Sequence, residues 1–392
     1  MPPNPLLGVV FHWLGGLASG SFYVPYRFVK RWSWETYWLV GGVFSWIIAP
    51  WVFAFFLTRN LPAVLAGTPP RTWFFCILFG LMWGVGGLTF GLTMRYLGLS
   101  LGMAIVLGLC AAFGTLVPPI FNGTFMSEVL GTSSGRVILL GVFVCLAGIG
   151  FAGLAGIYKE REMSTDQQRA AIQEFDLRKG FLVAVLSGVM SACFKYGLDA
   201  GGAMKTLTIQ QGTSPLWQGL PVLIVVLIGG FATNFIWTLY LHIRNRTGHE
   251  YLAKELPAVS AVSAGGPQPV EDTALNGPTA AVFAHTVTEI LPETVRVPRL
   301  RNYVLCAVAG VTWYLQFFFY SMGETKMGIY TFSSWSLHMA SIVIFSTLWG
   351  LGLHEWRGAS RKPMRLLFLA LATLIGSTLI IGYGNYLSTP VH

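Results

Sequence analysis

Ten long apolar stretches follow one another along this chain of 392 residues. A helix needs about 20 mostly apolar residues to cross the ~30 Å hydrocarbon core of a bilayer, and each stretch has roughly that length. Only 10% of the residues are charged and 54% are hydrophobic, which excludes an ordinary soluble domain. The sequence therefore predicts an all-α integral membrane protein with ten transmembrane helices.

The predicted spans divide evenly around a charged connector. They cover residues 7–29, 36–57, 72–97, 99–121, 137–157, 180–198, 216–243, 303–322, 327–353 and 364–386. Five lie in 1–157, the connector is 158–179, and five lie in 180–392. Because each half has an odd number of spans, the second half must enter the membrane from the opposite face. We expect two inverted five-helix repeats, as in many secondary transporters, with a substrate site between them near the midplane.

A shared spacing favours the same repeat. Trp83 and Gly98 are 15 residues apart at the third span, and Trp313 and Gly328 have the same separation at the eighth. Chance could produce one such match in an apolar chain, but the even division into five and five spans supports repetition independently.

Lysine and arginine gather in the loops on one side of the predicted helices. With the amino terminus outside, nineteen of the 25 basic residues fall on the inner side. The outer loops hold only Arg59, Arg71, Arg136, Lys205 and Lys326, and Lys195 lies within a span. Cytoplasmic loops carry an excess of basic residues. We therefore expect a multi-pass protein of the bacterial inner membrane with both termini in the periplasm.

Residues 245–301 form a long segment that is rich in Ala, Val, Pro, Gly and Thr. It lacks an 18-residue apolar run, so we expect a flexible cytoplasmic insertion with a short surface helix over 281–291. The net charge of +9 reflects the inner loops and does not require a nucleic-acid partner. The partners expected are the lipid bilayer and small molecules, with no obligate protein partner.

Motifs for cofactors and catalysis are missing from the sequence. All five cysteines lie in apolar runs without a CxxC pair, and the chain has no Walker loop, HExxH or GxSxG. We expect no cofactor, no metal site and no enzymatic activity.

Five segments carry a family resemblance. They are RWSWETYWLVGGVFSWIIAPW at 31–51, GLTMRYLGLSLGM at 91–103, TWYLQFFFY at 312–320, SSWSLHM at 333–339 and HEW at 354–356. Together they resemble the bacterial L-rhamnose–proton symporter family. The resemblance implies the drug/metabolite transporter superfamily, ten helices in two inverted repeats, and uptake of L-rhamnose or a related sugar driven by protons. It also implies an acidic residue just before 333–339, where this chain has Thr331.

Lys195 and Asp199 stand out in the sixth span, where the resemblance implies uncharged residues. They are four residues apart and therefore share one helix face. A charge at mid-bilayer costs about 2.5–3.5 kcal/mol on insertion scales, so such residues are often functional. Asp199 could exchange a proton while Lys195 pairs with it or contacts a sugar hydroxyl. Alternatively, the pair lies near the outer interface and extends its charges to water.

Two histidines lie inside predicted spans. His338 is near the middle of the ninth span, and His12 shares a face of the first span with Tyr23. An imidazole can carry a proton or bond a sugar hydroxyl. We treat both as candidates for substrate binding and proton coupling, and Tyr23 as a candidate for substrate binding. The alternative is a structural hydrogen bond between helices.

Trp313, Gln316 and Tyr320 lie along one face of the eighth span at spacings of three and four. An indole ring packs on the C–H face of a pyranose, and an amide offers a donor and an acceptor to hydroxyls. Trp83 is the repeat equivalent of Trp313. We expect these four residues to line the substrate cavity, although ordinary helix packing would also explain the tryptophans.

Arg27, Glu35, Arg95 and Glu355 map to the cytoplasmic ends of different spans. They could form an ion-pair gate that breaks when the inner side opens. Alternatively, they are solvated charges that only set the topology.

The favoured function is secondary active uptake of L-rhamnose or a closely related sugar by proton symport through alternating access. One alternative is a metabolite exporter or exchanger with the same fold. Another is a membrane sugar sensor or enzyme that uses the cytoplasmic insertion.

Overall fold

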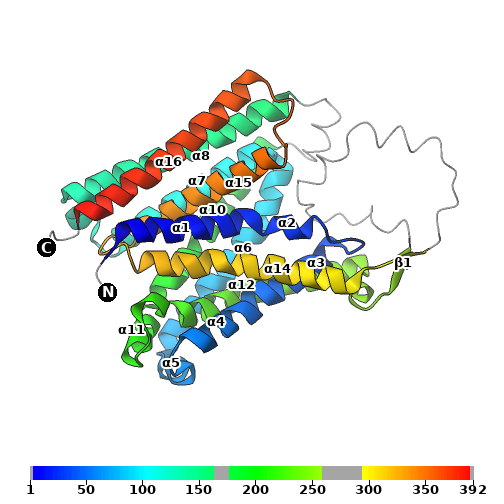
Figure 1. Cartoon of the computed structure of the whole chain (residues 1–392), viewed down its shortest axis with the longest axis horizontal. Helices are drawn as coiled ribbons and strands as arrows, with labels where there is room; N and C mark the ends of the chain where they lie inside the picture. The colour runs from blue at the N-terminus through cyan, green and yellow to red at the C-terminus, as the bar shows by residue number, and fades with distance from the viewer. Residues whose placement is uncertain (1–2, 163–175, 258–293, 389–392) are drawn as a thin grey trace.

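The computed structural model describes residues 3–162, 176–257 and 294–388 (Figure 1). Ten helices in this part of the chain are long and apolar enough to cross a membrane, which confirms the predicted number. In the first half they are α1 (Pro5–Ser21) continued by α2 (Tyr23–Tyr26), α3 (Trp34–Gly42) continued by the π-helical η1 (Val43–Ile48) and α4 (Ala49–Leu57), α6 (Pro70–Leu97), α7 (Leu99–Phe121) and α8 (Ser133–Arg161). In the second half they are α10 (Leu177–Ala200), α12 (Leu220–Asn245), α14 (Arg299–Glu324), α15 (Ser333–Gly352) and α16 (Arg361–Leu387).

Short elements connect the spans. They are α5 (Leu61–Gly67), η2 (Phe125–Leu130), α11 (Gly202–Gln210), η3 (Pro215–Trp217), η4 (Gly248–Tyr251), β1 (Glu255–Pro257) and β2 (Thr294–Arg296). The two strands pair antiparallel, with Leu256 opposite Val295, and both lie within the predicted insertion of residues 245–301. The predicted surface helix at 281–291 and residues 163–175 of the connector lie outside the described residues.

The observed helices differ from the predicted spans mainly at their first residues, which are set by local features such as a capping side chain or a glycine. The sixth span begins at Leu177 instead of residue 180 because the Asp176 carboxylate caps it, accepting a hydrogen bond of 3.0 Å from the Lys179 amide. The ninth begins at Ser333 instead of residue 327 because Gly328 has a φ of +64°, which no helix continues through. The eighth continues to Glu324, two residues beyond the predicted end.

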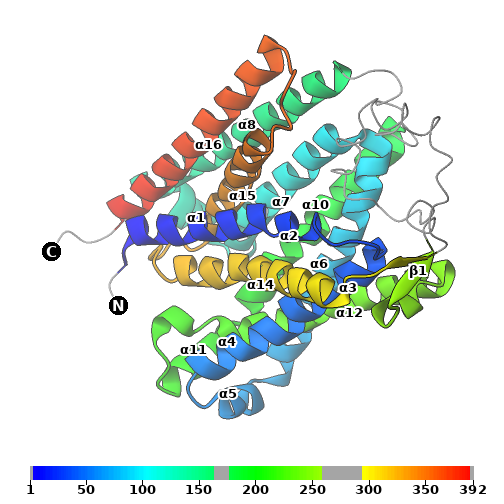
Figure 2. The same cartoon turned by 45° about the vertical axis from the view of Figure 1, so that its right-hand side comes forward.

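The spans run between two ends of the molecule. One end carries both termini, α5 and α11, and the other carries the strand pair and the connection from α2 to α3 (Figure 1). Helices α8 and α16 lie side by side in both views (Figure 2). Gly141 and Gly148 of α8 and Gly384 of α16 allow this contact, because a Cβ on any of them would lie within 2.7 Å of the other helix.

Helix contacts correspond between the two halves. The third span, α6, packs against α10 and α12, the sixth and seventh spans. The eighth span, α14, packs against α1 and against α3 with η1, the first and second spans. Glycine makes both approaches close: a Cβ on Gly80 would lie 2.2 Å from the Val226 carbonyl oxygen, and one on Gly310 would lie 2.3 Å from that of Gly41. These matched contacts are those expected of two similar halves, and the inverted repeat itself stays a prediction.

Candidate functional site

Two histidines and a tyrosine from three helices meet inside the protein. His12 lies on α1, Tyr320 on α14 and His338 on α15, and all three are fully buried. The ring centroid of Tyr320 is 5.3 Å from that of each histidine, and the two imidazoles are 6.5 Å apart. We call these three residues the histidine cluster.

Small residues bring the three helices together. A Cβ on Gly15 would lie 2.8 Å from the Gln316 carbonyl oxygen, and one on Gly16 would overlap Ser341 of α15. The Ser341 hydroxyl also donates to the His12 carbonyl oxygen at 2.9 Å. Helix α1 is thus held closely between α14 and α15, and this position fixes both histidines.

The histidine cluster holds five polar atoms without a hydrogen-bond partner among the described residues. They are both ring nitrogens of His12, both ring nitrogens of His338 and the Tyr320 hydroxyl. A buried polar group without a partner costs about 1–3 kcal/mol, so such a group needs an explanation. Each neutral imidazole offers a donor and an acceptor, and the phenol offers both. The arrangement can therefore bind a ligand rich in hydroxyls or pass a proton between neighbours.

Aromatic rings surround this polar centre. Trp335 lies edge-on to Tyr320, with ring centroids 5.6 Å apart, and 6.1 Å from His338. Phe194 stacks on Phe317 at 3.8 Å, and Phe317 is 5.9 Å from His338. Rings and polar atoms together are the combination that protein sites use for small polar ligands with apolar faces.

The predicted tryptophan pair also meets. Trp83 and Trp313 lie 5.8 Å apart, and Trp46 is edge-on to both at 6.3 and 5.6 Å. Trp46 belongs to the π-helical η1, a backbone irregularity often found at functional sites. Gln316 lies one turn along α14 from Trp313 and is buried.

A narrow cavity adjoins the tryptophans. It is lined by Phe22, Tyr26, Trp38, Gly42, Ser45, Trp46 and Trp313, and its volume is about 10 Å³. That space holds one water molecule at most, so a sugar can occupy this region only after the helices move. Tyr23 lies beside this cavity, with its ring stacked on Trp38 at 6.4 Å.

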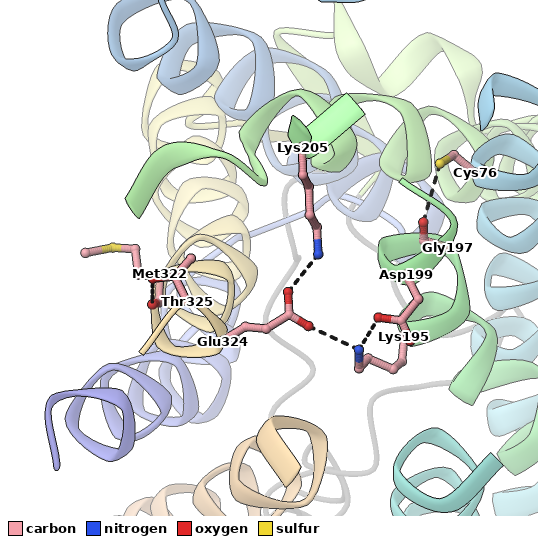
Figure 3. Close-up of polar contacts among 8 residues, drawn as sticks. All are labelled: Cys76, Lys195, Gly197, Asp199, Lys205, Met322, Glu324 and Thr325. Atoms are coloured by element: carbon pink, nitrogen blue, oxygen red, sulfur yellow. Dashed lines mark hydrogen bonds and ion pairs between the residues drawn. The ribbon is translucent and has the colours of Figure 1, made fainter. Parts of the chain in front are cut away.

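Four charged side chains meet at the end of the molecule that carries the termini (Figure 3). Lys195 bonds Asp199, as the spacing predicts, and also Glu324 at 3.1 Å. Lys205 of α11 bonds the other oxygen of Glu324 at 2.8 Å. We call Lys195, Asp199, Lys205 and Glu324 the charged cluster. Lys195 is only 1% exposed, so it does not extend to solvent.

Two of the four predicted gate residues form an ion pair with each other. Arg27 and Glu355 form an ion pair at 3.7 Å that joins α2 to the segment after α15. Glu35 is fully buried and accepts hydrogen bonds from Asn245 at 2.9 Å and Thr247 at 2.8 Å. Arg95 is exposed near the end of α6.

Comparison with known proteins identifies the family of this chain. The family model described as L-rhamnose-proton symport protein (RhaT) matches residues 1–252 and 293–386. An L-rhamnose-proton symporter of Cronobacter sakazakii is 35% identical over 96% of this chain and 97% of its own length. Symporters of the same description from Shigella boydii and Escherichia coli are 36% identical over 96% of this chain and 97% of their own lengths.

The chain belongs to the RhaT family. With its ten apolar helices, this RhaT family member is a multi-pass protein of the inner membrane, and its family is one of transporters rather than enzymes. The family match leaves out residues 253–292, which lie within the long insertion of residues 245–301.

Sequence reasoning did not single out Glu324 or Lys205 as site residues of this RhaT family member. Both were placed in loops, because the predicted eighth span ended at residue 322 and the sixth at residue 198. The sequence carried only a weak signal: Glu324 lies two residues beyond the predicted end of a span that already carries Gln316 and Tyr320.

Proposed function

We propose that this protein takes up L-rhamnose together with a proton by alternating access. The observation that carries the proposal is the histidine cluster, because five unpartnered polar atoms are buried at the junction of α1, α14 and α15. Its relatives are described as L-rhamnose-proton symporters. A sugar would supply the hydroxyls that these atoms lack.

The sugar is proposed to lie between the histidine cluster and the tryptophans. Tyr320, Gln316 and Trp313 follow one face of α14, so one helix presents both kinds of contact. The apolar face of the sugar packs on Trp313 and Trp83, while Gln316, His12 and His338 bond its hydroxyls. Tyr23 and Lys195 border this region from opposite ends of the molecule.

Alternating access is supported by the matched halves. Gly80, Trp83 and Gly98 recur as Gly310, Trp313 and Gly328 at a constant offset, and both Gly98 and Gly328 have positive φ. Residues 1–157 and 180–392 are therefore proposed to be inverted repeats that rock around the site.

A polar network closes each end of the molecule. The charged cluster lies at the end with the termini, and the Arg27–Glu355 pair lies towards the end with the strand pair. The basic loops place the termini in the periplasm in this proposal, which makes the charged cluster the outer network and Arg27–Glu355 the inner one.

The proton is proposed to pass through the histidine cluster. His12 and His338 contact the same tyrosine, so sugar and proton would share one site. Asp199 is the third residue that the sequence suggests as a proton carrier. Its ion pair with Lys195 connects it to this region.

Uptake of radiolabelled L-rhamnose into proteoliposomes, with and without an inward proton gradient, tests the proposal. We expect accumulation above the outside concentration with the gradient and equilibration without it. Equal uptake in both conditions would refute symport and leave facilitated transport. Transport of labelled amino acids or nucleotide sugars, with no saturable uptake of rhamnose, would point to the exporter or exchanger alternative.

A further inference from the structure

We propose that Glu324 carries the coupled proton, and that Lys195 and Lys205 hold its carboxylate deprotonated when the outer side is closed. The inference rests on the proposed symport and names the residue that performs its coupling step. Neither the family resemblance nor the sequence spacing pointed to Glu324.

The contacts of Glu324 come from different elements. Its side chain is about 10% exposed and extends from the end of α14 between two ammonium groups (Figure 3). One oxygen accepts from Lys195 of α10 at 3.1 Å, and the other accepts from Lys205 of α11 at 2.8 Å. Two cations on one buried carboxylate favour its ionised form strongly.

Asp199 is placed differently. Its side chain is 38% exposed and, within the described part of the chain, forms an ion pair only with Lys195, four residues earlier on the same helix. Movement between helices does not separate two residues of one helical turn, so this pair stays intact during a conformational change. Asp199 therefore acts as a positioning residue that keeps Lys195 charged and directed at Glu324.

The Glu324 pairs, in contrast, cross between helices that can separate. Opening of the outer side requires the end of α14 to move away from α10 and α11. Both ammonium groups then leave the carboxylate, and without their charges it takes up a proton more readily. Closure returns the two lysines, and the proton leaves the carboxyl oxygen.

A neighbouring group can receive that proton. Gly323 packs against His12 so closely that a Cβ there would lie 2.8 Å from the His12 Nε2. Tyr320, one turn before Glu324 on α14, contacts both histidines. Lys195 and Lys205 contact Glu324 directly and Asp199 pairs with Lys195, while His12 packs against Gly323 and Tyr320 lies one turn earlier on α14. The proton released by Glu324 then passes towards the histidine cluster, because His12 packs against the residue that precedes Glu324.

The test separates exchange from driven accumulation in proteoliposomes. Exchange of labelled for unlabelled L-rhamnose across the membrane needs no net proton movement, whereas accumulation does. For Glu324→Gln we expect exchange to continue while accumulation driven by a proton gradient falls to the equilibrium level. Glu128→Gln is the matched control, because Glu128 is exposed and lies in η2. It should accumulate rhamnose as the unmodified protein does.

Three outcomes would overturn the inference. One is accumulation by Glu324→Gln above equilibrium, and another is a folded Glu324→Gln protein that loses exchange together with accumulation. If the glutamine variant does not fold, Glu324→Asp replaces it, and the pH dependence of rhamnose accumulation by this variant should be shifted. A pH dependence identical to that of the unmodified protein is the third outcome that would overturn the inference. Absence of rhamnose exchange by the unmodified protein would instead refute the proposed function.

Discussion

The indole rings of Trp83 and Trp313 lie 5.8 Å apart, although one belongs to the third span and the other to the eighth. Both also contact Trp46, so the three rings form one aromatic surface at the contact between the two halves. A sugar ring that packs on this surface would contact both halves at once. Its binding could then depend on how the halves are placed relative to each other.

The first prediction concerns this aromatic surface. Trp313→Leu and Trp83→Leu should each raise the KM for rhamnose about two- to tenfold, because an aromatic contact contributes about 0.5–1.5 kcal/mol beyond its area. Initial rates of labelled uptake measure the change. Trp237→Leu is the control, since Trp237 is partly exposed on α12 and should leave KM unchanged. Equal effects at all three positions would show that the substitutions act only on folding.

The second prediction concerns His338. His338→Leu removes two buried nitrogens that have no partner, so thermal unfolding of the variant should occur at the same or a higher temperature than that of the unmodified protein. The same variant should bind rhamnose about tenfold more weakly, since it loses hydrogen bonds to the sugar. If His338→Leu markedly lowers the unfolding temperature and leaves the affinity for rhamnose unchanged, His338 serves only in helix packing.

The third prediction concerns the matched glycines. Gly80→Ala and Gly310→Ala should each lower the unfolding temperature and reduce transport, because the new Cβ meets a backbone carbonyl that cannot move aside. Gly87→Ala is the control on α6, where a Cβ would meet nothing within 4 Å. It should be neutral or slightly stabilising, as alanine favours a helix by about 1 kcal/mol over glycine. Tolerance of alanine at Gly80 or Gly310 would contradict the close approach.

The fourth prediction concerns Arg27 and Glu355. Their side chains are partly exposed, so the pair contributes only about 0.2–1 kcal/mol. Arg27→Glu should change the initial rate of uptake about two- to fivefold, because two like charges then favour an open inner side. Exchanging both charges, with Arg27→Glu and Glu355→Arg together, should restore the rate. If the double variant takes up rhamnose no faster than the single variant, the two residues only set the orientation of the protein in the membrane.

Several features could be predicted from the sequence because they depend on local chemistry. The ten spans follow from the length and hydropathy of each stretch, and the contact of Lys195 with Asp199 follows from their spacing of four on one helix. Trp83 and Trp313, both expected from the sequence to line one cavity, lie in contact.

Other features depend on how helices pair in three dimensions, which no spacing along the chain determines. His12 and His338 lie on the first and ninth spans, and they meet only because Gly15 and Gly16 let α1 approach α14 and α15. Glu324 was placed in a loop, so its contacts with two lysines could not be anticipated. Glu35 was grouped with the gate charges by its position at a helix end, yet it bonds Asn245 and Thr247.

The most direct test of sugar and proton coupling is the pH outside lightly buffered, non-energised vesicles after addition of L-rhamnose. The account predicts that the outside becomes alkaline as each sugar enters with a proton, and that an uncoupler abolishes the change. Entry of labelled rhamnose without any change in outside pH would contradict it.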